Sequence, residues 1–212
     1  MSEARPARRT PPARGTGAGG SLRLFVAVQL DPALRPAVGS LCRTLLQAWP
    51  HGRELVKWVE PHNLHLTVKF LGPVPEHLVP RLSEVLEVLE SFPSFRLHLV
   101  GLGAFPRARG ARVLWIGIQE GAEQLGRLAR RVEEALEPLG FTRERRPYSP
   151  HLTIGRLRTP AYHPELEAEV TRAACVEVGF QDVHSVELME STLRPQGPVY
   201  TVVRSYPLRE RG

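Results

Sequence analysis

The tripeptide His-Leu-Thr occurs twice, and the residues around each copy match as well. The copies are His65-Leu66-Thr67-Val68 and His151-Leu152-Thr153-Ile154. A proline lies four residues before each histidine and a leucine six residues after it, at Pro61 and Leu71 in the first copy and at Pro147 and Leu157 in the second. One offset therefore aligns the whole pattern with its copy. This match indicates a duplication, so we expect two similar halves packed together.

The pattern of apolar residues predicts the same order of elements in both halves. The first half has an apolar strand at 22–30, then helices at 34–49 and 78–89 on either side of the strand that carries His65. The second half has a strand at 113–119, then helices at 125–139 and 163–172 on either side of the His151 strand. Further strands are expected at 95–103, 175–180, 183–190 and 199–206. We predict an α+β fold in which two antiparallel sheets, flanked by helices, form two lobes related by a pseudo-two-fold axis around a central cleft.

The N-terminal segment differs from the rest of the chain. It is rich in Pro, Gly and Arg and lacks aliphatic periodicity, so we predict a disordered tail over residues 1–21 and one bilobal domain over 22–208. Four arginines against one glutamate in the first 20 residues supply half of the net charge of +6. The remainder is mildly basic, which is compatible with a polyanionic substrate but does not demonstrate one.

No segment of the sequence is typical of a membrane or secreted protein. The longest apolar runs have the length of strands, and the N-terminus lacks the apolar core of a signal peptide. We therefore expect a cytoplasmic protein that does not contact membranes. Nothing in the sequence requires an obligate protein partner, and we expect a monomer.

Each copy of the repeat places an imidazole beside a hydroxyl group. Alternate side chains of a strand share a face, so His65 and Thr67 point one way, and His151 and Thr153 share a face in the same manner. Two imidazoles on opposite sides of a phosphorus can divide an in-line displacement. One takes a proton from water and the other gives a proton to the departing oxygen. The threonine hydroxyls would donate hydrogen bonds to the non-bridging phosphate oxygens.

Metal-dependent cleavage would need a different set of side chains. Such sites cluster carboxylates and histidines, but Asp31 and Asp182 are the only aspartates in the chain, and Asp31 is better explained as a helix cap. No His-x-x-x-His or His-Glu-x-x-His spacing occurs. We expect neither a metal nor any other cofactor.

Several segments resemble one known family. They are Asn63–Gly72, Phe105-Pro106, Arg112–Trp115 and Arg146–Ile154. These segments are similar to the bacterial and archaeal RNA 2',3'-cyclic phosphodiesterases, also called 2'-5' RNA ligases, of the two-histidine (2H) phosphoesterase superfamily. The resemblance runs from about residue 23 to 206, which is nearly all of the chain outside the N-terminal tail.

The resemblance implies a metal-independent hydrolase that opens a terminal 2',3'-cyclic phosphate on RNA and leaves a 2'-phosphomonoester. By motif position it implies that His65 is the proton donor to the leaving 3'-oxygen and that His151 is the acceptor that activates water. Thr67 and Thr153 would hold the phosphate. The partner would be RNA with a cyclic phosphate end, such as a tRNA fragment, and 2'-5' ligation would be a secondary reverse activity.

Four further residues are candidate RNA contacts. Lys69 shares the face of His65 by simple alternation, either near the phosphate or only at the rim of the cleft. Arg156 lies by alternation on the face opposite His151, so it needs a bulge or a strand end to reach phosphate. Arg146 and Tyr148 precede the second motif and either contact the RNA end, Tyr148 by stacking on a base, or serve only in a solvated loop and in packing.

Two alternatives to this function remain open. The same site could act on a small cyclic phosphate or on another 2'-5' linked nucleotide, or the fold could bind RNA ends without turnover. Phe25 and Trp115 occupy matching places in the two halves, which favours core packing over nucleotide stacking for both.

Overall fold

The computed structural model describes residues 20–106 and 109–210. Residues 1–19, which make up most of the predicted tail, lie outside the described residues. The first strand begins at Ser21, the last residue assigned to the tail. No helix among the described residues is long and apolar enough to cross a membrane.

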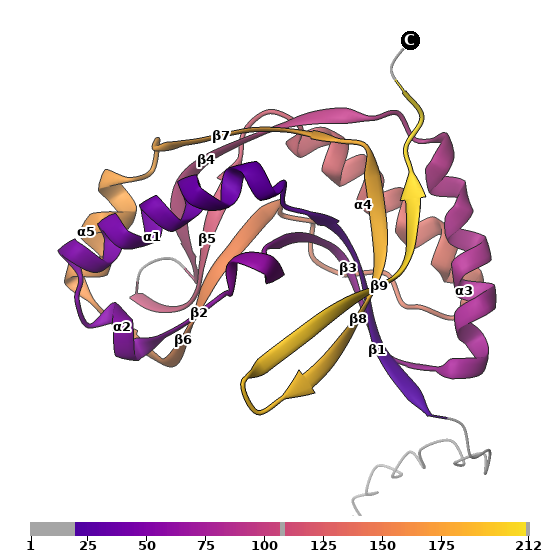
Figure 1. The fold of residues 1–212 in the computed structure, drawn as a ribbon, viewed down its shortest axis with the longest axis horizontal. Helices are drawn as coiled ribbons and strands as arrows, with labels where there is room; N and C mark the ends of the chain where they lie inside the picture. Colours follow the sequence, from indigo (N-terminus) through magenta and orange to yellow (C-terminus); the bar gives the residue numbers. More distant parts are fainter. Residues whose placement is uncertain (1–19, 107–108, 211–212) are drawn as a thin grey trace, which may run out of the picture.

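Two antiparallel sheets form the framework (Figure 1). The four-stranded sheet has the order β3-β1-β8-β9, with β3 at His65–Pro75, β1 at Ser21–Gln29, β8 at Ser185–Arg194 and β9 at Gly197–Pro207. The five-stranded sheet has the order β2-β6-β5-β4-β7, with β2 at Val56–Trp58, β6 at His151–Tyr162, β5 at Arg109–Ile118, β4 at Phe95–Phe105 and β7 at Glu177–Val183. The two strands that carry the His-Leu-Thr repeat therefore belong to different sheets.

Five α-helices and five short 3-10 helices connect the strands of the described chain. The α-helices are α1 at Arg35–Ala48, α2 at Gly52–Leu55, α3 at Val79–Val85, α4 at Ala122–Leu136 and α5 at Pro164–Arg172. The 3-10 helices are η1 at Pro32–Leu34, η2 at Pro61–Asn63, η3 at Glu76–Leu78, η4 at Leu86–Ser91 and η5 at Glu137–Leu139. The predicted cap is present, since the side chain of Asp31 accepts a hydrogen bond of 2.8 Å from the backbone N–H of Ala33 at the start of η1.

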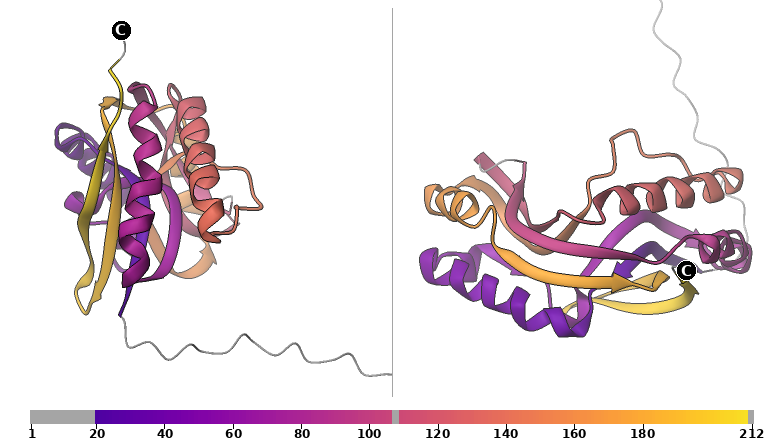
Figure 2. Two further views of the ribbon diagram at one scale, coloured as in Figure 1. Left: turned by 90° about the vertical axis from the view of Figure 1, so that its right-hand side faces the viewer. Right: turned by 90° about the horizontal axis from the view of Figure 1, so that it is seen from above.

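The helices divide between the two sheets, and each sheet receives helices from both halves of the chain. Helix α1 follows β1 but packs with α5 against β7 of the five-stranded sheet, whereas α4 follows β5 but packs with α3 beside β3 of the four-stranded sheet. Figures 1 and 2 show these two helix pairs at opposite ends of the molecule. We call the four-stranded sheet with α3 and α4 the first lobe, and the five-stranded sheet with α1 and α5 the second lobe.

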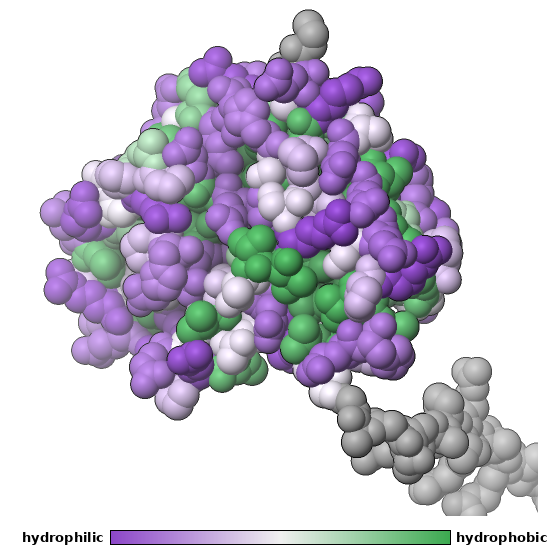
Figure 3. All heavy atoms as spheres, turned by 45° about the vertical axis from the view of Figure 1, so that its right-hand side comes forward, coloured by the Kyte–Doolittle hydropathy of each residue, from purple (hydrophilic) through white to green (hydrophobic). Residues whose placement is uncertain are grey.

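The exchange of helices confirms two similar lobes but shows that they are not simply the two halves of the chain. One continuous hydrophobic core runs through both, and it includes the apolar partners of both histidine motifs, Leu66 and Leu152, each fully buried. The lobes therefore share buried apolar surface, which is the largest favourable contribution to folding. Figure 3 shows that this face is mostly hydrophilic, with hydrophobic side chains at several places and the largest group of them near its middle.

Both histidine strands contain one extra residue at the same place in the repeat. In β3, Thr67 and Lys69 pair with the adjacent residues Ala27 and Val26 of β1, so Val68 is unpaired. In β6, Thr153 and Gly155 pair with Trp115 and Leu114 of β5, so Ile154 is unpaired. An extra residue of this kind is a β-bulge, and it reverses the alternation of side chains beyond it.

Candidate functional site

His65 is held at the start of β3 by hydrogen bonds on both ring nitrogens. Its Nδ1 lies 2.7 Å from the carbonyl oxygen of Asn63, and its Nε2 lies 3.1 Å from Oγ1 of Thr67. A carbonyl oxygen can only accept, so Nδ1 carries the proton of the neutral ring and Nε2 accepts from the Thr67 hydroxyl. Asn63 is itself buried, and its Nδ2 donates to the carbonyl of Pro198 at 2.9 Å. Strand β9 thus fixes the turn that orients His65.

Two aromatic rings enclose the His65 imidazole. The ring centroid of Phe25 lies 5.0 Å from that of His65, and the Tyr200 ring stands almost perpendicular to it at 5.1 Å. Burial by these neighbours lowers the pKa of His65, and the positive charge of Arg156 lowers it further, against an opposing contribution from the hydrogen bond to Asn63. The free protein therefore favours the neutral imidazole, and an anion in the site would favour the protonated ring.

His151 has a matching arrangement at the start of β6. Its Nδ1 donates to the carbonyl of Ser149 at 2.7 Å, two residues earlier, as His65 does to Asn63. The Phe105 ring stands edge-on to the His151 ring, with 5.2 Å between the ring centroids, and the centroid of the Trp115 ring lies 6.3 Å from that of His151. The indole of Trp115 has room because of Gly103, where a Cβ atom would lie 2.2 Å from the indole ring. The two histidines of the sequence repeat thus have the same tautomer, and each lies beside two aromatic rings.

A pocket of about 250 Å³ joins the two lobes at these strands. His65 and Thr67 line it from β3, and Thr153 and Arg156 line it from β6. The remaining lining residues are Arg23, Leu24, Phe25, Val59, Phe70, Gly72, Ser191 and Tyr200. His151 is not among the lining residues, although strands β3 and β6 contact each other and His151 opens β6. The structure therefore brings four of the eight predicted site residues onto one pocket.

Lys69 does not share the face of His65, so that expectation from alternation was wrong. The bulge at Val68 turns the Lys69 side chain into the protein, where only 4 % of it is exposed. Its Nζ lies 2.8 Å from Oε1 of Glu133 on α4 and donates to the carbonyl of Thr142 at 3.1 Å. Lys69 anchors a helix to β3 and does not line the pocket.

Arg156 reaches the pocket through the corresponding bulge in β6. Without the extra residue Ile154 its side chain would point away from His151, whereas here it is exposed and lines the pocket beside Thr153. The residue before it, Gly155, occupies the place of Lys69 in the repeat. A Cβ atom at Gly155 would lie 2.6 Å from a methyl group of Val56, so no side chain fits there. The bulge that sequence reasoning required for Arg156 is therefore present.

Tyr148 and Arg146 lie in the segment that leads into β6. The hydroxyl of Tyr148 donates to the carbonyl of Thr67 at 3.0 Å, and burial raises the pKa of this phenol. Tyr148 therefore connects the approach to His151 with the strand of His65. Arg146 is exposed, and neither residue lines the pocket. Their contact with RNA stays a prediction.

Several pocket residues were not assigned from the sequence, among them Tyr200, Arg23 and Phe70. Tyr200 comes from β9, outside the repeated motif, so no local pattern marked it. Phe70 follows the first bulge as Arg156 follows the second, and it is 63 % exposed. Phe25 is buried as expected for core packing, but its ring also forms a wall of the pocket. The described part of the chain contains no group of three or more His, Cys, Asp or Glu side chains placed to bind a metal ion.

The sequence was compared with models of known protein families. Residues 40–192 match the model of the 2'-5' RNA ligase superfamily. The chain belongs to the 2'-5' RNA ligase superfamily. The resemblance inferred from the sequence is thereby confirmed.

Relatives in the 2'-5' RNA ligase superfamily align along most of their length. An RNA 2',3'-cyclic phosphodiesterase of Archaeoglobus fulgidus is 38% identical over 185 residues, which cover 87% of this chain and 99% of that protein. One of Methanothermobacter thermautotrophicus is 38% identical over 188 residues, covering 88% of this chain and 99% of that protein. The crystal structure of TT0787 of Thermus thermophilus superposes with a TM-score of 0.73 at 31% identity, covering 90% of this chain and all of that one. The crystal structure of Escherichia coli LigT complexed with 3'-AMP superposes with a TM-score of 0.69 at 25% identity, covering 89% of this chain and 98% of that one. The predicted fold, an α+β protein with two antiparallel sheets, is confirmed.

Proposed function

We propose that this chain hydrolyses the 2',3'-cyclic phosphate at the end of an RNA strand and leaves a 2'-phosphomonoester. The main support is the pocket between the lobes, where a histidine and two threonines of the repeated motif meet an arginine that has no carboxylate partner among the described residues. Relatives named RNA 2',3'-cyclic phosphodiesterase align with this chain over most of its length.

The two imidazoles divide the proton transfers of the reaction. His151 Nε2 takes a proton from water as the water oxygen bonds to phosphorus, because Nδ1 is already occupied as a donor to Ser149. The bond from phosphorus to the 3'-oxygen breaks, and protonated His65 gives its Nε2 proton to that oxygen. The electron pair of the broken bond leaves with the 3'-oxygen, and the phosphate stays on the 2'-oxygen. Each turnover exchanges the protonation states of the two rings.

The threonines and Arg156 stabilise the charge that develops on phosphorus. Thr67 and Thr153 donate hydrogen bonds to the non-bridging oxygens from opposite walls of the pocket, and Arg156 supplies positive charge on the side of β6. An anionic phosphate in the pocket also raises the pKa of His65, which burial and Arg156 lower in the free protein. Substrate binding therefore favours the protonated form of His65, which is the form that donates the proton.

This mechanism assigns no step to a metal or to another cofactor. RNA with a cyclic phosphate end is the substrate, and tRNA fragments are one class of it. In 2'-5' ligation the 5'-hydroxyl of a second RNA strand takes the place of water, and the same bond from phosphorus to the 3'-oxygen breaks. We further propose that the enzyme works in the cytoplasm as a monomer without an obligate protein partner.

End-group analysis of the product tests this function. Purified protein is incubated, with EDTA present, with an RNA oligonucleotide ending in a 2',3'-cyclic phosphate and with cyclic mononucleotides. We expect a 2'-phosphate product and loss of at least about 100-fold in rate in His65→Ala and in His151→Ala, since general acid–base catalysis contributes about that much or more. His77→Ala, which alters an exposed histidine of η3, is the matched control.

Five outcomes would contradict or change the proposal. A 3'-phosphate product would overturn the assignment of the broken bond, and loss of activity in EDTA would overturn metal independence. Full activity in either of the two histidine variants would exclude the paired mechanism. If only cyclic mononucleotides were hydrolysed, the substrate would be a small cyclic phosphate and not RNA. If RNA ends were bound but not hydrolysed, the protein would be a non-catalytic RNA-end-binding module.

A further inference from the structure

Two positively charged side chains face each other across strands β2 and β6. In the antiparallel register of these strands, Lys57 is the direct partner of Arg156. Directly opposite residues of an antiparallel pair project from the same face of the sheet, with Cβ atoms about 5 Å apart. Lys57 therefore projects from the face on which Arg156 lines the pocket.

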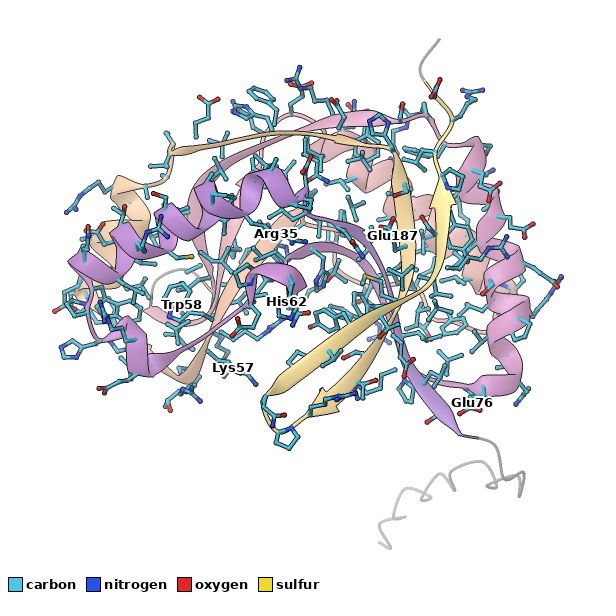
Figure 4. All side chains as sticks on the ribbon, in the orientation of Figure 1. Arg35, Lys57, Trp58, His62, Glu76 and Glu187 are labelled. Carbon is cyan, nitrogen blue, oxygen red and sulfur yellow. The ribbon has the colours of Figure 1, made fainter. Side chains whose placement is uncertain are left out.

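Burial on both strands agrees with this placement. The preceding pair, Val56 and Leu157, is buried in the core, whereas Lys57 and Arg156 are both exposed. Figure 4 labels Lys57 and, further along the chain, His62, both on the margin of the second lobe that faces the hairpin of β8 and β9. Lys57 lies beside the pocket but is not among its lining residues.

Neither charge is neutralised by the protein. In the described part of the chain, no carboxylate lies within ion-pair distance of Lys57 or Arg156, whereas Lys69, the other lysine of the chain, is paired with Glu133. Like charges placed directly opposite on neighbouring strands destabilise a sheet unless an anion lies between or above them. The arrangement is thus suited to a ligand that carries more than one negative charge.

We propose that Lys57 forms a second phosphate subsite, which binds the internucleotide phosphate next to the terminal cyclic phosphate of an RNA strand. This inference rests on the proposed function and extends it. Arg156 lies between the two subsites, so the terminal phosphate occupies the pocket and the preceding phosphate lies over the Lys57 side chain. The preferred substrate is then an oligonucleotide, and a nucleoside cyclic monophosphate uses only half of the basic surface.

The opposite wall of the pocket offers a different path for the RNA strand. Arg23 of β1 lines the pocket on the side of the first lobe and is exposed. Its partner in β3 is Pro73, so no second cation stands opposite it in that pair. The pairing of two cations favours the path over β2, and the experiment below compares the two sides.

The test compares a substrate with one phosphate and a substrate with two. Hydrolysis of cytidine 2',3'-cyclic phosphate and of a dinucleotide that ends in the same cyclic nucleotide is measured for the wild type and for Lys57→Ala, Lys57→Arg and Arg23→Ala. We expect Lys57→Ala to lower kcat/KM for the dinucleotide by about tenfold, the size of one charge-assisted contact, with no change for the mononucleotide. Lys57→Arg should restore most of the loss, and the salt dependence in Lys57→Ala should be weaker by about one phosphate contact.

Arg81→Ala is the matched control, because Arg81 is an exposed cation on α3 that pairs with Glu84. Equal losses on both substrates would place Lys57 at the scissile phosphate, and no loss on either would remove the subsite. A loss specific to the dinucleotide in Arg23→Ala and not in Lys57→Ala would direct the RNA over the first lobe. Each of these results overturns the inference while the enzyme remains active. Absence of hydrolysis of both substrates by the wild type would instead overturn the proposed function.

Discussion

The two histidines of the repeat share a tautomer, and the surroundings of His65 lower its pKa. Both donate from Nδ1 to the carbonyl two residues earlier, so both present Nε2 to the reaction. Phe25 and Tyr200 enclose the His65 ring, and its burial lowers its pKa. The positive charge of Arg156 lowers this pKa further. A proton donor with a lowered pKa loses its proton at lower pH, so the His65 ring of the free protein should titrate below the usual histidine value of about 6.5.

The charge of Arg156 makes a testable contribution to this pKa. Replacing Arg156 by Gln removes a positive neighbour, which stabilises protonated His65 and should raise its pKa, although burial keeps the value below that of an exposed histidine. The measurement is an NMR titration of the His65 ring in the free protein. Arg81→Gln removes the same charge at a remote surface site and should leave the His65 titration where it is. A His65 pKa that falls or does not move in Arg156→Gln would contradict this account.

At the scale of elements, the two β-bulges decide which side chains reach the site. Val68 and Ile154 are single extra residues at the same point of the repeat, and each reverses the alternation beyond it. The first bulge buries Lys69 against α4, and the second exposes Arg156 beside Thr153. Of the two motifs, the second thus contributes a basic residue to the pocket, while the first contributes Phe70 at the equivalent place.

The ion pair of Lys69 should therefore matter for stability and not for chemistry. Lys69→Met leaves the Glu133 carboxylate without a cation, although the N–H of Glu144 still donates to it at 2.9 Å, so we expect the free energy of unfolding to fall by about 2 kcal/mol. The double variant Lys69→Met, Glu133→Leu should recover most of this loss, because no charge remains unpaired. Denaturant unfolding measures stability, and kcat/KM is measured under conditions where each variant is folded. Loss of hydrolysis in the folded double variant would show that Lys69 serves the phosphate after all.

At the scale of the molecule, hydrogen bonds between the lobes hold the two motifs in position. Gln181 of β7 is buried and bonds twice to the end of β1, where its Nε2 donates to the carbonyl of Gln29 at 2.7 Å and its Oε1 accepts from the N–H of Asp31 at 2.9 Å. Gln29 is the direct neighbour of His65 across β1 and β3. Gln181 thereby ties the five-stranded sheet to the strand beside His65.

Breaking this link should affect both stability and rate. Gln181→Leu leaves the Gln29 carbonyl and the Asp31 N–H without their partner, so we expect a loss of about 2 kcal/mol in the free energy of unfolding. We also expect kcat to fall more than KM rises, because the reaction depends on the relative position of the lobes more than on substrate affinity. Gln47→Leu, at an exposed position of α1, is the control. An unstable Gln181→Leu protein with an unchanged kcat would show that other contacts position the lobes.

Local patterns determined the parts of the protein that depend on neighbouring residues along the chain. The repeat identified the two motifs, and period-two alternation placed His65 with Thr67 and His151 with Thr153 because no bulge lies between those positions. Apolar spacing predicted most of the helices and strands, since it reflects which face of each element is buried. Family membership followed from the same residues.

Only the tertiary structure decided what depends on a partner strand or on the other half of the chain. The register of β3 against β1 and of β6 against β5 creates the two bulges. The first turns Lys69 away from the pocket, and the second places Arg156 in the pocket lining. Strand β9 brings Tyr200 to His65, and the packing of α1 on the second lobe and α4 on the first builds one core from both halves. The sequence of one strand does not show where such a bulge falls, because the bulge is set by how that strand packs with its neighbour and with the helices around a common interior.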